Sequence, residues 1–366
     1  MKIFNKFITI SVILCLALSF GACSHTCSFD KQVANETYFS SDATCTESAK
    51  YYLSCSCGEK GTETFSYGEP LGHNYNWWSE DGNGNRVRQC SRDSSHTLSQ
   101  RLDAWNDDGV LKILTIGNSF SVDSMEYVYG IAKATGVSMV ELGNLYYGSC
   151  TLETHLNKAL TDNREYTFYT CEDSSGWVAN KDRSLKYAVQ YNDWDFISFQ
   201  QGSLASGKAE TYDYLEDLIE FVKPLCSNEN VQFGWHITWA YQGDSDRYHQ
   251  RYENQSTMYY LITGAVQSKV LPREDMSFVI PNGTSIQNAR TSYVGDTLTR
   301  DGHHLSYGRG RFIASVTTVA TLIGIDYENI DLSEVFDDEK FVQVALESAK
   351  NAVLAPFSVT QSQITE

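Results

Sequence analysis

Short apolar runs alternate with segments of helical periodicity through most of the chain beyond residue 110. The runs, each typical of a buried strand, are residues 111–116, 137–142, 194–199, 231–237 and 276–280. Helical spacing of apolar residues follows Ser121 and recurs in residues 152–160, 212–222, 256–270 and 307–322. Strands that alternate with helices predict an α/β fold, a doubly wound parallel sheet with helices on both faces.

Polar residues follow the first run, at the edge where an open α/β sheet binds its ligands. Gly117-Asn118-Ser119 turns from the expected strand into the next helix. A serine there lies beside backbone N–H groups at a helix N-terminus, and these groups can receive the oxyanion formed when the serine attacks. The alternative is a serine that only caps the helix. The Gly-x-Ser-x-Gly elbow of α/β-hydrolases does not occur in the sequence.

A second candidate lies near the last of these helices, where the chain runs Asp301-Gly302-His303-His304. An aspartate three residues before a histidine, on a turn that enters a helix, can place both side chains on one face. The carboxylate then orients the imidazole and stabilises its cation, while the other ring nitrogen faces the serine. Asp-x-x-His alone is common, but its combination with a serine at an early strand end is specific.

This combination resembles the SGNH (GDSL-type) hydrolases over about residues 110–325, as an uncharacterised bacterial branch of that superfamily. Their nucleophile block matches Gly117-Asn118-Ser119, and their closing Asp-x-x-His matches Asp301 and His304. The resemblance implies a flavodoxin-like three-layer α/β/α fold of SGNH type. It also implies a catalytic triad of Ser119, Asp301 and His304.

Two further blocks of the superfamily supply its oxyanion hole. Residues 144–149 match the block with a glycine donor, which makes the N–H of Gly148 the candidate beside that of Ser119. The third block normally reads Gly-x-Asn-Asp, whereas this sequence lacks the asparagine and has Gln201, whose side chain is one methylene longer. The resemblance therefore implies an oxyanion hole of Ser119, Gly148 and Gln201.

Four further residues near the expected strand ends are candidates for binding substrate: Asn118, His236, Trp239 and Tyr241. His236 is either a substrate contact or a hydrogen-bonded core histidine, and the aromatic residues either stack on a sugar or pack. Arg290 and Arg300 are expected to pair with carboxylates in so acidic a chain. The sequence has neither a Gly-rich phosphate loop nor a His-Glu-x-x-His pattern, so we expect neither a cofactor nor a metal in the catalytic domain.

The first residues of the chain have the pattern expected of a secretory signal peptide. Residues 7–20 form an apolar run behind two lysines, too short for a comfortable membrane span but suited to a secretory signal. The run ends in Phe20-Gly21-Ala22-Cys23, which resembles a bacterial lipobox. We expect residues 1–23 to be a lipoprotein-type signal peptide with lipid on Cys23, and plain secretion is the alternative. Either route leads to the bacterial cell surface or beyond it, with membrane contact only through a lipid anchor.

Cysteines crowd the next segment, residues 24–104, which is also rich in Ser, Thr, Gly and Asn. This composition predicts a small loop-rich β module that needs covalent or metal cross-links because its core is thin. We expect Cys27, Cys45, Cys55 and Cys57 to form disulfides; the less favoured alternative is tetrahedral zinc, with His25 or His73 as substitute ligands. Residues 43–73 resemble a short repeat of bacterial surface proteins, followed by a degenerate second copy.

The net charge of the chain indicates which classes of binding partner to expect. The 366 residues include 28 basic and 46 acidic side chains, a net charge of −18 that repels phosphate backbones and excludes nucleic acid as an expected partner. We expect a serine esterase that removes an acetyl or other small acyl group from a carbohydrate through an acyl-enzyme. The alternative is a catalytically inactive glycan-binding surface protein of the same fold. Residues 326–366 are expected either to complete the hydrolase domain or to add a helix such as 339–354.

Overall fold

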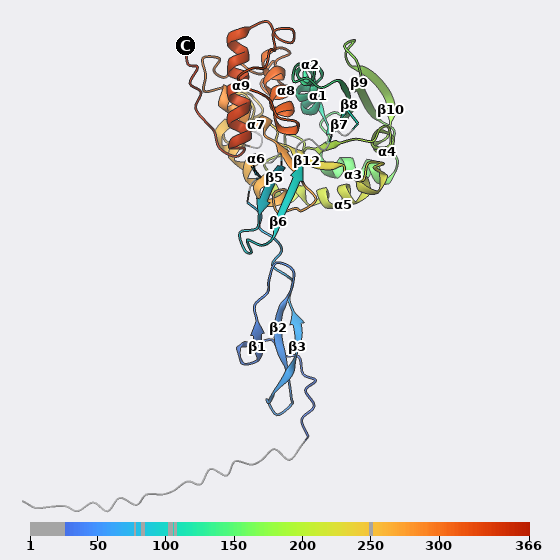
Figure 1. Ribbon diagram of the computed structural model, residues 1–366, viewed down its shortest axis with the longest axis vertical. Coiled ribbons are helices and arrows are strands. Elements are labelled where there is room, and N and C mark those ends of the chain that lie inside the picture. Colours follow the sequence, from blue (N-terminus) through green and yellow to red (C-terminus); the bar gives the residue numbers. More distant parts are fainter. Residues whose placement is uncertain (1–25, 77, 82–84, 102–104, 106–107, 249–251) are drawn as a thin grey trace, which may run out of the picture. The chain divides into compact units, whose positions relative to one another are not determined.

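The computed structural model describes residues 26–366, apart from residues 77, 82–84, 102–104, 106–107 and 249–251 (Figure 1). The chain divides into two compact units, one ending at His73 and one running from Asn74 to Glu366. The expected signal peptide, Cys23 and His25 lie outside the described residues. Among the described helices, none combines the length and apolar character that crossing a membrane requires.

The smaller unit is a three-stranded antiparallel sheet. Its elements are a 3-10 helix η1 (Glu36–Tyr38) and strands β1 (Phe39–Ser41), β2 (Ala49–Ser54) and β3 (Lys60–Tyr67), which pair in that order. The Tyr51 ring lies 5.9 to 6.0 Å from the rings of Phe39, Phe65 and Tyr67. Because Phe39 and Tyr67 are exposed, this aromatic cluster covers a surface and does not fill a core.

A seven-stranded sheet forms the centre of the larger unit, in the order β10-β9-β8-β7-β11-β12-β13. The five parallel strands are β7 (Val110–Gly117), β8 (Met139–Tyr146), β11 (Phe196–Phe199), β12 (Gln232–His236) and β13 (Phe278–Ile280). Their spatial order is the flavodoxin-like 2-1-3-4-5 arrangement. Central strand β7 buries every residue after Val110. The predicted doubly wound parallel sheet is confirmed.

Two antiparallel strands extend the sheet beyond β8 and were not predicted. They are β9 (Tyr166–Cys171) and β10 (Val178–Arg183). Strand β10 has no buried residue along its length, so it carries no apolar run that would reveal it. An antiparallel edge strand can remain exposed because it does not need helices on both faces.

Helices cover both faces of the sheet, as predicted (Figure 1). One packed group contains α1 (Ser119–Met125), α2 (Val128–Ala134), α7 (Asn282–Ala289), α8 (Arg309–Leu322) and α9 (Glu339–Leu354). The other contains α3 (Leu152–Leu160), α4 (Leu185–Val189) and α5 (Tyr214–Val222), with α6 (Gln255–Lys269) joined to it through the 3-10 helix η3 (Ala209–Tyr212). Because α9 packs on α7 and α8, the segment after residue 325 is packed into the larger unit.

The single helix expected after Ser121 is instead two helices, α1 and α2. The Ser315 hydroxyl accepts a hydrogen bond from Tyr127 N at 3.1 Å and donates one to Ser124 O at 2.9 Å. A side chain inserted in this way interrupts the helical hydrogen-bond ladder and separates the two helices. Sequence periodicity does not register such an insertion, because Ser315 lies on α8.

The expected boundary between residues 104 and 110 is replaced by one after His73. The second repeat copy forms β4 (Ser79–Glu80), β5 (Asn85–Gln89) and β6 (Thr97–Arg101), which belong to the larger unit. Buried Arg88 donates hydrogen bonds to Leu271 O at 3.2 Å and Arg273 O at 2.8 Å. Arg86 donates to Thr321 O. These contacts join the second copy to the rest of the larger unit.

Candidate active site

Ser119 lies at the carboxyl end of central strand β7. The strand ends at Gly117, Asn118 caps α1 by accepting a hydrogen bond from Phe120 N at 3.0 Å, and Ser119 is the first helical residue. Asn118 therefore fills the capping role that was the alternative for Ser119. A Cβ at Gly117 would lie 2.7 Å from Ser121 Oγ, so only glycine fits this turn.

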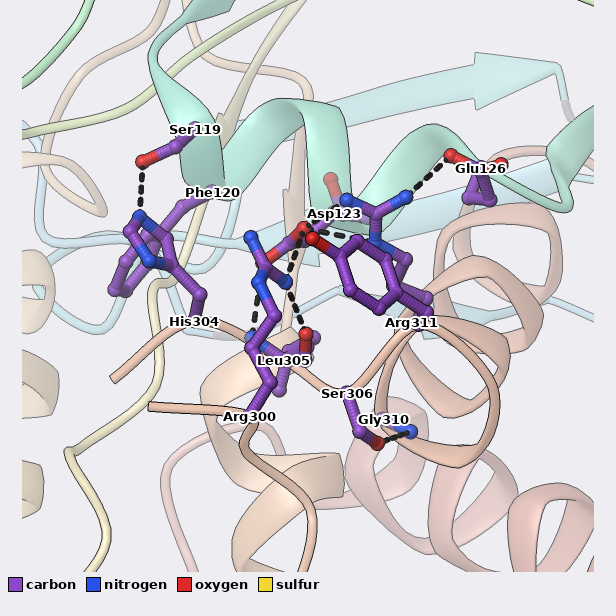
Figure 2. Close-up of polar contacts among 12 residues, drawn as sticks. Ser119, Phe120, Asp123, Glu126, Arg300, His304, Leu305, Ser306, Gly310 and Arg311 are labelled. Carbon is purple, nitrogen blue, oxygen red and sulfur yellow. Dashed lines mark hydrogen bonds and ion pairs between the residues drawn. The ribbon is translucent and has the colours of Figure 1, made fainter. Parts of the chain in front are cut away.

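His304 and Asp301 reach Ser119 from the other end of the chain. His304 Nε2 lies 2.8 Å from Ser119 Oγ (Figure 2), and His304 Nδ1 lies 2.7 Å from Asp301 Oδ2. Because an ionised carboxylate can only accept, Nδ1 carries the hydrogen and Nε2 accepts from the serine hydroxyl. The structure thus brings together a serine hydroxyl, an imidazole and a carboxylate in the geometry of a Ser-His-Asp array.

The electrostatics of the turn keep Asp301 charged. Burial pushes the pKa of Asp301 upward, but hydrogen bonds from the His304 ring and from the backbone N–H groups of His304 and His303 outweigh it and hold this pKa below its ordinary range. Burial and repulsion from the adjacent His304 lower the pKa of His303. Asp301 is therefore ionised where it contacts His304, and the neighbouring His303 is neutral.

The loop that contains Gly148 is anchored to the turn that carries Ser119. This loop follows β8, and Tyr147 N donates to Gly117 O at 3.3 Å while Asn118 Nδ2 donates to Cys150 O at 3.1 Å. Gly148 lies between these two anchors. Within the described part of the chain, no hydrogen bond uses the N–H of Ser119 or of Gly148. Both groups are therefore available to a bound oxygen.

The expectation that Gln201 is an oxyanion donor is wrong. Its side-chain nitrogen donates to Thr211 O and Oγ1, both at 3.0 Å. Its side-chain oxygen accepts from Leu152 N at 3.1 Å and Gly202 N at 2.8 Å. The buried amide thus uses both of its hydrogens and its oxygen to join three backbone segments.

The four residues predicted to bind substrate are buried, with exposed fractions of 2% or less: Asn118, His236, Trp239 and Tyr241. Trp239 donates from Nε1 to His303 O at 2.7 Å and stacks on Phe120 with a centroid distance of 4.2 Å. The Tyr241 hydroxyl lies 2.8 Å from Ser203 Oγ. These side chains support the site from within and do not present a surface to a substrate, so the prediction of substrate contact is corrected.

His236 belongs to a buried chain of hydrogen bonds that ends at the cap of α1. Asn282 Nδ2 donates to His236 Nε2 at 3.1 Å, and His236 Nδ1 donates to Gln200 Oε1 at 3.0 Å. Gln200 Nε2 then donates to Asn118 Oδ1 at 2.7 Å. Burial lowers the pKa of His236 to about 3, so the ring is neutral and can donate from one nitrogen while it accepts at the other. Of its two interpretations, the core histidine is correct.

A buried carboxylate that no sequence motif indicated, Asp123, lies one turn after Ser119 on α1 (Figure 2). Asp123 accepts a hydrogen bond from Leu305 N at 2.9 Å. It also binds Arg300 at 3.1 Å and Arg311 at 2.7 to 2.8 Å. Arg300 reaches back to Leu305 O, so the backbone that follows His304 is held at both its N–H and its carbonyl.

The predicted pairing of arginines with carboxylates is confirmed for Arg300 with Asp123 and for Arg290 with Asp296. The sequence signal for the partner was the position of Asp123, four residues after Ser119 and therefore one turn along the same helix. Asp123 can be identified as this partner only from the tertiary structure, which places Arg300 beside α1.

Residues 112–354 match the model of a domain of unknown function, DUF4886. The chain belongs to the DUF4886 family. A solved DUF4886 family protein from Bacteroides uniformis is 31% identical, with a TM-score of 0.64 over 69% of this chain and 98% of that chain. No curated protein matches the sequence.

The DUF4886 chain is also similar to two solved hydrolases at lower identity. A catalytic mutant of an acetylxylan esterase from Geobacillus stearothermophilus is 12% identical, with a TM-score of 0.38 over 59% of this chain and 95% of that chain. A GDSL-like lipase from Bacteroides thetaiotaomicron is 9% identical, with a TM-score of 0.33 over 55% of this chain and 82% of that chain.

Proposed function

We propose that this DUF4886 protein is a serine ester hydrolase that removes an acetyl or other small acyl group from a carbohydrate. The observation that carries the proposal is the contact of Ser119 Oγ with His304 Nε2 at 2.8 Å, with His304 in turn held by Asp301. Ser119 is partly exposed, so a substrate can reach it, whereas Asn118 and Phe120 on either side are buried.

The reaction proceeds through an acyl-enzyme. Ser119 Oγ attacks the ester carbonyl while His304 takes its proton, and the N–H groups of Ser119 and Gly148 stabilise the oxyanion, each donor of this kind being worth about 3–4 kcal/mol of barrier. The intermediate expels the alcohol, which His304 protonates, and the acyl group remains on Ser119. His304 then deprotonates a water that attacks the acyl carbonyl, and Ser119 leaves with the proton as the acid is released.

The choice of a carbohydrate ester as substrate rests on the expected export through residues 1–23 and on the resemblance to SGNH hydrolases. Lipid attachment at Cys23 and location at the cell surface belong to the same proposal. Replacing Cys23 with alanine tests the anchor: we expect the protein to move from the membrane fraction to the medium. Unchanged membrane association would exclude Cys23 as the attachment point.

The first experiment is labelling of the purified protein with a fluorophosphonate. We expect rapid labelling of the wild type and none of Ser119→Ala. The matched control is Ser124→Ala on the same helix, because the Ser124 hydroxyl is buried and donates only to Ser121 O. Loss of labelling in Ser119→Ala alone identifies the nucleophile. Equal labelling of wild type and Ser119→Ala rejects it.

The alcohol part of the substrate is tested separately, with an acetyl ester of a simple phenol beside acetylated xylan and acetylated monosaccharides. We expect acetate release from at least one acetylated carbohydrate with a higher kcat/KM than from the phenol ester. Turnover of the phenol ester alone would retain the esterase and remove the carbohydrate from the proposal.

A glycan-binding protein without activity is the second candidate, and the commitment of Gln201 to Thr211 favours it because one side-chain donor is then missing from the oxyanion hole. It predicts glycan affinity with neither fluorophosphonate labelling nor acetate release. The contact between Ser119 and His304 argues against it, since binding alone has no use for an oriented base.

A further inference from the structure

The smaller unit lacks the apolar core that an independent fold normally needs. Among described residues 26–73, the buried ones are Cys45, Ser54, Cys55 and Gly61. Two of these four are cysteines, and neither a leucine nor an aromatic ring is among them. Units of this size usually fold only with disulfides, metals or oligomerisation, because their hydrophobic burial does not offset the conformational entropy lost on folding.

Three of the cysteines meet at one end of this sheet. Cys27 Sγ lies 3.4 Å from Cys57 Sγ, and these two sulfurs and Cys55 Sγ all lie within 4.8 Å of one another. Cys27 precedes the first strand, whereas the other two follow β2, so the group joins segments about thirty residues apart in sequence. Cys45, which the sequence analysis grouped with them, is not part of this cluster.

Backbone hydrogen bonds hold the segments that carry the three cysteines close together. Lys31 N donates to Ser54 O at 3.0 Å and Ser54 N donates to Lys31 O at 2.9 Å, which ties the Cys27 segment to the end of β2. A tight turn follows, in which Gly58 N donates to Cys55 O at 2.9 Å and Cys55 N donates to Glu59 O at 2.8 Å. Gly58 has φ of +92°, a value that favours glycine, and the turn places Cys55 and Cys57 on the same side as Cys27.

We propose that Cys27, Cys55 and Cys57 bind a zinc ion that serves as the cross-link of the smaller unit. In a tetrahedral zinc site with Zn–S bonds of about 2.3 Å, sulfurs lie about 3.8 Å apart. The Cys27–Cys57 separation of 3.4 Å is close to this value, and the other two separations are at most 4.8 Å. A disulfide joins only two sulfurs and would leave the third thiol beside it without a cross-linking role. Three thiols supply one face of the tetrahedron, and a further donor completes it. The proposal is independent of the esterase function.

Zinc binding and disulfide formation differ in the protons and electrons that the cysteines lose. Each cysteine that coordinates the ion as a thiolate releases one proton, and no electron is transferred. The alternative, a Cys27–Cys57 disulfide, instead needs an oxidant that takes two electrons and two protons. The two outcomes therefore differ in what releases the thiols: a chelator for the metal site and a reductant for the disulfide.

The experiment measures zinc in the full chain after purification in buffer with zinc and without chelator. The variants are Cys27→Ser, Cys55→Ser and Cys57→Ser, and the matched control is Cys226→Ser, a half-buried cysteine of the larger unit whose thiol donates a hydrogen bond to Val222 O. We expect each of the three variants to hold one zinc ion fewer per chain than wild type, and Cys226→Ser to hold as many as wild type.

Cys55→Ser is the decisive variant, because a Cys27–Cys57 disulfide would survive it whereas a three-thiolate zinc site would not. Alkylation of the wild type is the second measurement and stays informative if a variant does not fold. We expect Cys27, Cys55 and Cys57 to react only after a zinc chelator is added, without reductant. Unchanged zinc in all three variants, or a Cys27–Cys57 peptide pair that only a reductant separates, overturns the proposal.

Discussion

Replacing Asp123 with asparagine tests how the two ends of the chain are held together at the active site. The Asp123 carboxylate accepts hydrogen bonds from Leu305 N, Arg300 and Arg311 (Figure 2). Asparagine has the same size but only one acceptor oxygen, and its NH₂ group faces guanidinium groups that cannot accept a hydrogen bond. The substitution therefore removes a buried charge without creating a cavity.

The size of the effect follows from the burial of the partners. The side chains of Asp123, Arg311 and Arg300 are 1%, 10% and 23% exposed. Removing one partner of a buried ion pair costs about 3–5 kcal/mol. Arg300 is partly exposed and Arg311 keeps Glu126 as a partner at 2.7 Å. We therefore expect the lower end, about 3 kcal/mol of unfolding free energy.

The catalytic effect has a separate cause. Ser119 and Asp123 lie on one helix, and Leu305 directly follows His304, so Asp123 sets the position of the base relative to the nucleophile. A displacement of about 1 Å in such an array typically costs about 100-fold in rate. We expect Asp123→Asn to lower kcat by about this factor, with little change in KM, because no substrate contact is removed.

The assay compares fluorophosphonate labelling rate, kcat and KM at a temperature where every variant is folded, as shown by circular dichroism. Glu126→Gln is the control, since it removes the outer contact of Arg311 but leaves Asp123 bound to Leu305. As Glu126 is partly exposed, its loss is worth at most about 1 kcal/mol. If Asp123→Asn is less stable but labels and turns over like the wild type, the positioning argument is refuted. If the wild type itself does not label, the esterase proposal has failed instead.

Three other predictions follow from single contacts. Gln201→Ala should keep wild-type kcat in the folded enzyme but lower the urea midpoint, because the bonds to Thr211 are lost at a cost of about 1–3 kcal/mol; a kcat loss of 100-fold would restore Gln201 as an oxyanion donor. Asp301→Asn should lower kcat by about 10⁴-fold, since the amide selects the wrong His304 tautomer, and a wild-type kcat in a steady-state assay would contradict the triad. Burial raises the pKa of Asp195 to about 7, so the folded state binds that proton more tightly than the unfolded state, and stability should fall as pH rises from about 4 to about 7. Thermal melts of Asp195→Asn should lack that part of the pH dependence, and an unchanged profile would assign it to other groups.

The layered fold and the three triad residues were predictable from the sequence because each depends on local pattern. The buried strand from Val110 to Gly117 and the helix from Leu152 to Leu160 carry their own apolar periodicity. The order of strands in parallel sheets then places residue 119 at the ligand-binding edge. Ser119, Asp301 and His304 were identified by motifs whose spacing is itself part of the chemistry.

The remaining features of the site depend on residues that are distant in sequence. Gln201 lies where the oxyanion donor was expected, but its amide binds Thr211, and only the folded loop decides which acceptor it reaches. His236 binds Gln200, and through it Asn118, because β11, β12 and α1 are neighbours in space. Strand β10 was missed since its exposed residues have no apolar pattern.

By itself, the sequence therefore determined the strand and helix pattern, the parallel sheet and the motifs that contain Ser119, Asp301 and His304, the residues proposed as nucleophile, carboxylate and base. Only the tertiary structure decided which buried polar groups support them, as with Asp123, and which cysteines meet, as with Cys27, Cys55 and Cys57. The physical reason is the separation along the chain over which each kind of signal acts. Apolar periodicity and motif spacing act over a few residues, whereas a buried charge or thiol is defined by partners that come together only when the chain has folded.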